Sequence, residues 1–142
     1  MGIIQSVYDI WRVGQGKPKQ SVKNITKEEV RAIYSERYWT SSRAKWLQGP
    51  LDLVVFDTAV NFGVGRVNEF ISVGLGLAKT NAWTEQMSAK IHDANPKELA
   101  LAICTQRSLH RIKRVIEAPS QQVFLAGWTN RDKSLFETVI KL

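Results

Sequence analysis

The segment over residues 51–60 constrains the fold of this chain more than any other. It begins at Leu51, directly after Gly49-Pro50, with the nearly apolar run Leu-Asp-Leu-Val-Val-Phe. Proline suits the first turn of a helix, and the segment continues to Asn61, past the usual length of a strand. A helix that is apolar on nearly all sides must be buried. The sequence therefore predicts a central, buried helix here.

The remaining segments are also typical of helices. Thr26 and Glu29 form a capping-box pattern, and Asn95-Pro96 with Glu98 is a second strong helix start. Asn81 or Thr80 is expected to cap a further helix that runs to His92. The expected helices cover residues 3–12, 26–39, 51–61, 66–77, 81–92, 95–117 and 131–141. Seven short helices in 142 residues predict an irregular all-α domain.

The charge of the chain indicates an anionic partner. Twenty Lys and Arg against thirteen Asp and Glu give a net charge of +7. Such an excess favours nucleic acid, an acidic membrane surface or an anionic cell-wall polymer. No apolar run is long enough to span a membrane, because Gly74 and Gly76 break the longest one. No secretory signal is visible at the N-terminus.

Metal and nucleophilic chemistry are not indicated, so no metal and no cofactor are expected. His92 and His110 lie outside any metal-binding spacing. The single cysteine, Cys104, lies in the middle of a predicted helix, where a small buried side chain is the usual role. No phosphate-binding loop or Gly-x-Ser-x-Gly sequence occurs.

A polar pair interrupts the central apolar helix. Asp57 and Asn61 are spaced i, i+4 and share one face of that helix. Burying both costs free energy unless they are hydrogen-bonded, so either they satisfy each other or they line a cleft. Tyr38-Trp39 supplies an aromatic pair that would suit a sugar-binding groove.

A basic stripe lies near the end of the helix over residues 95–117. Arg107, Arg111 and Arg114 share a face at i, i+4 and i+7. The stripe is either an anion-binding surface or a solvated face near a helix C-terminus, where cations are favoured.

Several segments together resemble the lysozyme-like N-acetylmuramidases of glycoside hydrolase family 108, which include proteins labelled secretion activators. The matching stretches are GIIQSVYDIWRVGQGKP (2–18), ITKEEVRAIYSERYW (25–39) and FDTAVNFG (56–63) followed by Gly65-Arg66. Arg107 and the later GWTNR (127–131) resemble the peptidoglycan-binding helical module associated with that family. The resemblance implies a lysozyme-like fold, with a muramidase-like part over residues 1–66 and a peptidoglycan-binding part over residues 67–142, packed as one unit.

The chain departs from the family at the catalytic acid. Family members carry an acidic residue in a Glu-Gly-Gly-Tyr motif before the stretch that corresponds to GIIQSVYDIW, and no Glu-Gly-Gly occurs in these 142 residues. Glycoside cleavage needs a general acid. Because the motif glutamate is absent, the catalytic residue is unknown. Asp57 is the best remaining candidate by position, and Glu36 is an alternative. We expect a shortened form that binds glycan and hydrolyses it poorly or not at all.

The expected function is therefore binding and hydrolysis of peptidoglycan, the N-acetylmuramic acid glycan, by a lysozyme-like muramidase. The alternative is a non-catalytic module that binds glycan, a protein partner or another anionic partner. No recognition-helix, RNA-binding or zinc-finger motif supports nucleic acid. The protein is expected in the cytoplasm until it is released or exported to the cell wall or periplasm. Substrate contacts are expected from Tyr38, Trp39, Asp57, Asn61, Gly63 and Arg66, and a second anionic or glycan contact from Arg107, Arg111, Trp128 and Arg131.

Overall fold

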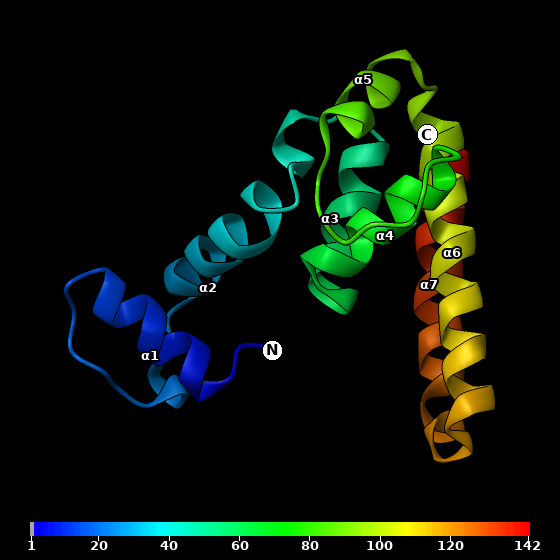
Figure 1. The fold of residues 1–142 in the computed structure, drawn as a ribbon. Coiled ribbons are helices and arrows are strands. Elements are labelled where there is room, and N and C mark those ends of the chain that lie inside the picture. Colours follow the sequence, from blue (N-terminus) through cyan, green and yellow to red (C-terminus); the bar gives the residue numbers. More distant parts are fainter. Residues whose placement is uncertain (1) are drawn as a thin grey trace. The chain divides into compact units, whose positions relative to one another are not determined.

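The computed structural model describes residues 2–142, which contain seven α-helices and no β-strand (Figure 1). The predicted all-α class is thereby confirmed. The helices are α1 (Gln5–Gly14), α2 (Lys27–Tyr34), α3 (Leu51–Phe62), α4 (Val64–Gly74), α5 (Glu85–Asp93), α6 (Pro96–Glu117) and α7 (Leu125–Lys141).

The chain divides into two compact units, residues 1–37 and residues 38–142. The boundary between them falls within a π-helical segment, Ser35–Thr40, that follows α2. The functional division expected near residue 66 stays a prediction. In the structure, residue 66 lies inside α4, which packs on both α3 and α6.

The first unit consists of α1, α2 and a short 3-10 turn, Val22–Asn24. The capping box at the start of α2 is present as predicted: Thr26 accepts from the backbone N–H of Glu29, and Glu29 accepts from the backbone N–H of Thr26. These two bonds satisfy N–H groups that the first turn of a helix leaves unpaired.

A buried polar cluster joins α1 to α2 in this unit. Tyr8 is fully buried and donates from Oη to Glu29 at 2.9 Å, and Arg12 Nη1 donates to the same carboxylate at 3.0 Å. Burial raises the pKa of Glu29, but the hydrogen bonds from Thr26, Tyr8 and Arg12 outweigh it and lower that pKa overall. Glu29 is thus held as a structural carboxylate.

Helix α3 is the buried centre of the second unit, as the apolar run predicts. Val54, Val55 and Ala59 have no exposed surface, and α3 packs against both α4 and α6. The core around it is completed by apolar side chains from the other helices of the unit: Val67, Phe70, Ile71, Met87, Leu99, Ala100, Ile103, Cys104, Leu135 and Val139. Burial raises the pKa of the Cys104 thiol to about 11, which fits a packing role.

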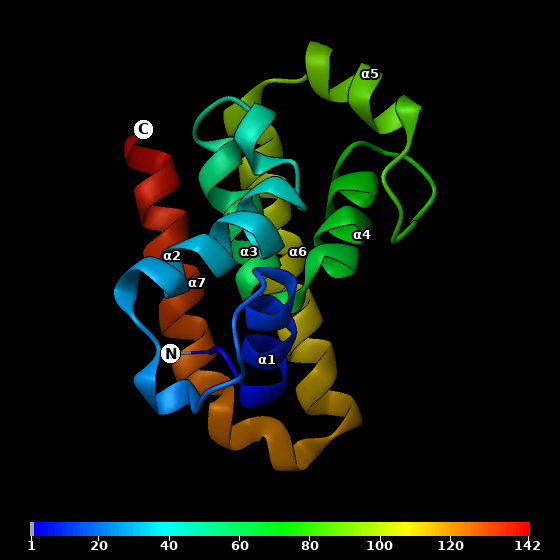
Figure 2. The same ribbon diagram turned by 90° about the vertical axis from the view of Figure 1, so that its left-hand side faces the viewer.

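Helices α6 and α7 form a long pair joined by the 3-10 segment Pro119–Phe124 (Figures 1 and 2). The predicted start of α6 is confirmed, since the Asn95 side chain accepts from the Glu98 backbone N–H at 3.0 Å and Pro96 opens the helix. Helix α4 comes close to α6 at Gly74, where an added Cβ would lie 3.1 Å from Leu99 Cδ1.

Two predicted helix starts are wrong. Helix α5 is capped by Thr84, which accepts from the Met87 backbone N–H, and not by Asn81 or Thr80. Helix α7 begins at Leu125 and not at Arg131. Its first turns contain Gly127, a poor helix former, and packing against α6 outweighs that local preference.

None of the helices within residues 2–142 combines the length and apolar character that crossing a membrane requires.

Candidate functional site

A buried ion-pair cluster joins three helices of the second unit. Arg107 of α6 has no exposed surface; its Nη1 donates to Asp57 Oδ2 of α3 at 2.6 Å and to Thr58 Oγ1 at 3.1 Å. Its Nη2 donates to Asp132 Oδ1 of α7 at 3.0 Å. Asp132 is itself buried and lies 3.2 Å from Arg111 Nε. These contacts hold α3, α6 and α7 together around one guanidinium.

This cluster changes the interpretation of the basic stripe. A solvated face is wrong for Arg107 and Arg111, because both are buried. Direct ligand contact by Arg107 is also not supported, since its side chain reaches no surface. Arg107 is therefore a positioning residue, whereas Arg111 and Arg114 line a cavity described below.

The polar pair on α3 satisfies itself and also extends to α7. Asn61 Nδ2 donates to the backbone oxygen of Asp57 at 2.7 Å and to Asp57 Oδ2 at 3.3 Å. The side-chain oxygen of Asn61 accepts from Arg131 Nη1. Asp57 thus accepts from both Arg107 and Asn61, so its carboxylate is engaged in contacts that link α3 to α6.

Next to this pair lies a cavity of about 360 Å³, which we call the basic cavity. Its lining comes from α3, α4, α6 and α7 and comprises Asn61, Phe62, Arg66, His110, Arg111, Arg114, Trp128 and Arg131. Four arginines and no carboxylate line it. The arrangement can bind an anionic or hydrogen-bonding ligand, and it contains no acid that could protonate a leaving oxygen.

Aromatic rings hold one of the four arginines. The Arg111 guanidinium carbon lies 4.7 Å from the centre of the Phe62 ring and 5.6 Å from the centre of the Trp128 ring. The Trp128 ring is stacked on Phe124, with ring centroids 5.7 Å apart. Burial lowers the pKa of Arg111, and the nearby Asp132 opposes that shift.

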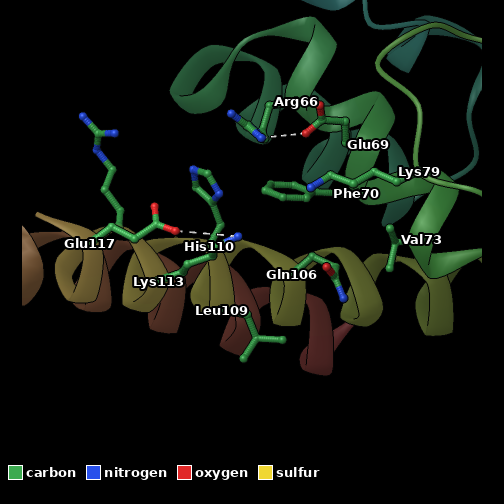
Figure 3. A pocket seen from close by; sticks show the side chains of 11 residues that line it. Arg66, Glu69, Phe70, Val73, Lys79, Gln106, Leu109, His110, Lys113 and Glu117 are labelled. Carbon is green, nitrogen blue, oxygen red and sulfur yellow. Dashed lines mark hydrogen bonds and ion pairs between the residues drawn. The ribbon is translucent and has the colours of Figure 1, made fainter.

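A second cavity, of about 350 Å³, adjoins the basic cavity and shares Arg66, His110 and Arg114 with it (Figure 3). Figure 3 shows Arg66 and Glu69 on α4 facing the His110 side chain of α6, with an ion pair of 2.7 Å between Arg66 and Glu69. Burial lowers the pKa of His110, and the nearby cations Arg66, Arg114 and Lys79 lower it further, while Glu69 opposes them. His110 is therefore mainly neutral at pH 7.

Gly63 sets the direction of the chain at the basic cavity. It separates α3 from α4 with φ of +89° and ψ of 157°, a conformation that residues with a Cβ adopt only under strain. The turn places Asn61 before it and Arg66 after it on the same cavity. Gly63 therefore shapes the basic cavity through the turn of its backbone.

The aromatic pair after α2 lies apart from the residues of the basic cavity. Neither Tyr38 nor Trp39 is among its lining residues. The Trp39 ring packs edge-on against Phe56, with centroids 5.5 Å apart, and both rings pack against the core. A contact between these two residues and a substrate stays a prediction.

The structure thus brings together two sets of residues that the sequence suggested separately. Asn61 and Arg66 from the first set meet Arg111, Trp128 and Arg131 from the second. Sequence reasoning named Arg114 only as part of the basic stripe, did not place Phe62 or His110 at the site, and missed Asp132 entirely. The spacing of Asp132 with Leu135 and Val139, at i, i+3 and i+7, puts it on the buried face of α7 and was a usable signal.

No group of three or more His, Cys, Asp or Glu that could hold a metal ion occurs among residues 2–142.

Comparisons with known proteins support the resemblance. The family model Glycosyl hydrolase 108 matches residues 1–63, so the similarity to this family is confirmed for the first unit, α3 and Gly63. The solved structure of SagA from Brucella abortus is similar in fold, with a TM-score of 0.80 and 21% sequence identity. The match covers 99% of this chain and 78% of that chain. No curated protein sequence matches the chain.

Proposed function

We propose that this protein binds the glycan strands of peptidoglycan through the basic cavity. The observation that carries the proposal is the meeting of Asn61 on α3 with Trp128 and Arg131 on α7 in one cavity. The match of residues 1–63 to a glycosyl hydrolase family supports a glycan as the ligand.

The chemistry of the lining suits an N-acetylated sugar. Trp128 is half-buried and offers an aromatic face on which a pyranose ring can stack. Asn61 and the arginines supply hydrogen-bonding groups for hydroxyl and acetamido groups, and Phe62 adds apolar surface. Sugar sites combine such features because a pyranose ring has apolar faces and a polar edge.

We further propose that the 142-residue chain hydrolyses peptidoglycan poorly. The 142-residue sequence contains no Glu-Gly-Gly-Tyr motif, and no carboxylate lines the basic cavity. Asp57, the candidate acid on α3, is engaged by Arg107 and Asn61. Since the proposed ligand is the wall polymer, the protein would act at the cell wall, after release or export from the cytoplasm.

Amide chemical shifts recorded while a soluble muropeptide is titrated into the full chain test this proposal. We expect the largest shifts at residues 61–66, 110–114 and 128–131, because these segments contribute the lining side chains. Shifts spread over exposed lysines such as Lys90 and Lys141, with none at Trp128, would indicate general charge attraction and contradict the proposal.

A further inference from the structure

The two adjoining cavities carry an excess of positive charge at the side chains that they share. Arg66 and Arg114 line both cavities, with His110 between α4 and α6 (Figure 3). Arg66 is paired with Glu69, but Arg114 and Arg131 have no carboxylate within ion-pair distance among residues 2–142. Neither Asn61 nor the aromatic rings of the basic cavity carry a balancing negative charge.

Arg111 adds a second, independent observation. Its side chain is 7% exposed; its Nη1 atom makes no hydrogen bond, and its Nε atom has only the 3.2 Å ion pair with Asp132. The carboxylate beside it, Asp132, is shared with Arg107. A buried guanidinium with unused donors is costly unless charge nearby compensates it. An anion in the adjoining cavity would supply that charge.

We propose that the basic cavity binds an anionic substituent of the glycan, a carboxylate or a phosphate, between Arg114 and Arg131, with the sugar ring against Trp128. This inference rests on the proposed function and deepens it. A neutral sugar leaves the arginines uncompensated, whereas an acidic sugar forms charge-assisted hydrogen bonds with them. In peptidoglycan, N-acetylglucosamine is neutral, and muramic acid carries a lactyl carboxylate that is either free or extended by a peptide ending in carboxylates.

Calorimetry on the full chain with four probes tests the inference. The probes are neutral chitohexaose, a muropeptide with free carboxylates, the same muropeptide with its carboxylates amidated, and inorganic phosphate. We expect the free acid to bind about tenfold or more tightly than its amidated form, in line with the strength of hydrogen bonds to charged groups. Chitohexaose should bind as weakly as the amidated muropeptide.

Replacing single arginines with glutamine shows which side chains bind the anionic group. Arg114→Gln and Arg131→Gln should each weaken binding of the free acid about tenfold more than they weaken binding of chitohexaose. The matched control is Lys90→Gln on α5, which removes one exposed charge that lines neither cavity, and it should leave both affinities unchanged.

His110 gives a spectroscopic readout that does not depend on affinity. Its imidazole titration in the free protein should lie below the ordinary value of 6.5, because burial and then Arg66, Arg114 and Lys79 disfavour the cation while Glu69 favours it. A bound anion favours the protonated ring, so the free-acid muropeptide should raise the pKa of His110. The amidated form should not.

The outcomes separate the two proposals. Equal affinity for the free and amidated muropeptides overturns the anionic subsite and leaves glycan binding standing. Binding of phosphate alone, weakened by Arg131→Gln, supports the anionic subsite and overturns the glycan proposal. A single-stranded oligonucleotide is titrated as a fifth probe, and if it binds more tightly than the free-acid muropeptide and is weakened by the same arginine variants, both proposals are overturned.

Discussion

Replacing Asp132 with asparagine is expected to destabilise the second unit by about 3 kcal/mol, which corresponds to about 10 °C in melting temperature for a chain of this length. Asp132 is buried and is the carboxylate shared by Arg107 and Arg111. The amide keeps the shape of the side chain but removes the negative charge, so two buried guanidinium groups lose a counter-ion. Urea unfolding followed by circular dichroism measures the change.

The control for this prediction is Glu137→Gln on the same helix. Glu137 is paired with Lys133 at 3.9 Å, and both side chains are largely exposed. Exposed pairs of this kind contribute less than about 1 kcal/mol. If Asp132→Asn costs no more than Glu137→Gln, the buried ion-pair cluster does not hold α3, α6 and α7 together as we describe.

Muropeptide release from purified sacculi by this 142-residue chain is expected to lie near background. Adding the upstream Glu-Gly-Gly-Tyr segment of family 108 should raise release about 10²–10⁴-fold, the usual contribution of a positioned general acid. Within the chain itself, Asp57 accepts from Arg107 at 2.6 Å and from Asn61 at 3.3 Å. Those bonds engage the Asp57 carboxylate in the ion-pair cluster, and Asp57 is not among the residues that line the basic cavity.

The control is the extended chain with the glutamate of that motif changed to glutamine, which should return release to background. Robust release by the unextended chain that is lost in Asp57→Asn would make Asp57 the catalytic acid. Robust release that survives Asp57→Asn would direct attention to Glu36. Either result would contradict our account of activity.

Local sequence signals were enough to predict the helices with clear starts. Helix α3 follows Gly49-Pro50 and is apolar on nearly every side, and α6 begins with an Asn-Pro cap. Helix α7 was placed too late because Gly127 and the polar residues after it are typical of a loop. Contacts with α6, which no local pattern shows, stabilise its first turns.

The candidate site was predicted in pieces. The i, i+4 spacing of Asp57 and Asn61 indicated a shared face, and the resemblance pointed to Trp128 and Arg131. That Asn61 and Arg131 touch follows only from the packing of both α3 and α7 against α6, which links residues 70 positions apart in the sequence. The burial of Arg107 could not be read from a charged stripe, because the two carboxylates that balance it lie on other helices.

Co-sedimentation of the protein with purified peptidoglycan sacculi tests the central claim, glycan binding by the basic cavity, most directly. The informative variant is Trp128→Ala, and its matched control is Trp46→Ala, which removes an exposed tryptophan outside the cavity. Arg131→Gln serves as a second variant, should Trp128→Ala fail to fold. We predict that Trp128→Ala weakens binding about tenfold or more, as expected for an aromatic side chain that carries much of the binding energy, while Trp46→Ala binds like the unchanged protein. Unchanged binding by folded Trp128→Ala and Arg131→Gln would contradict the account.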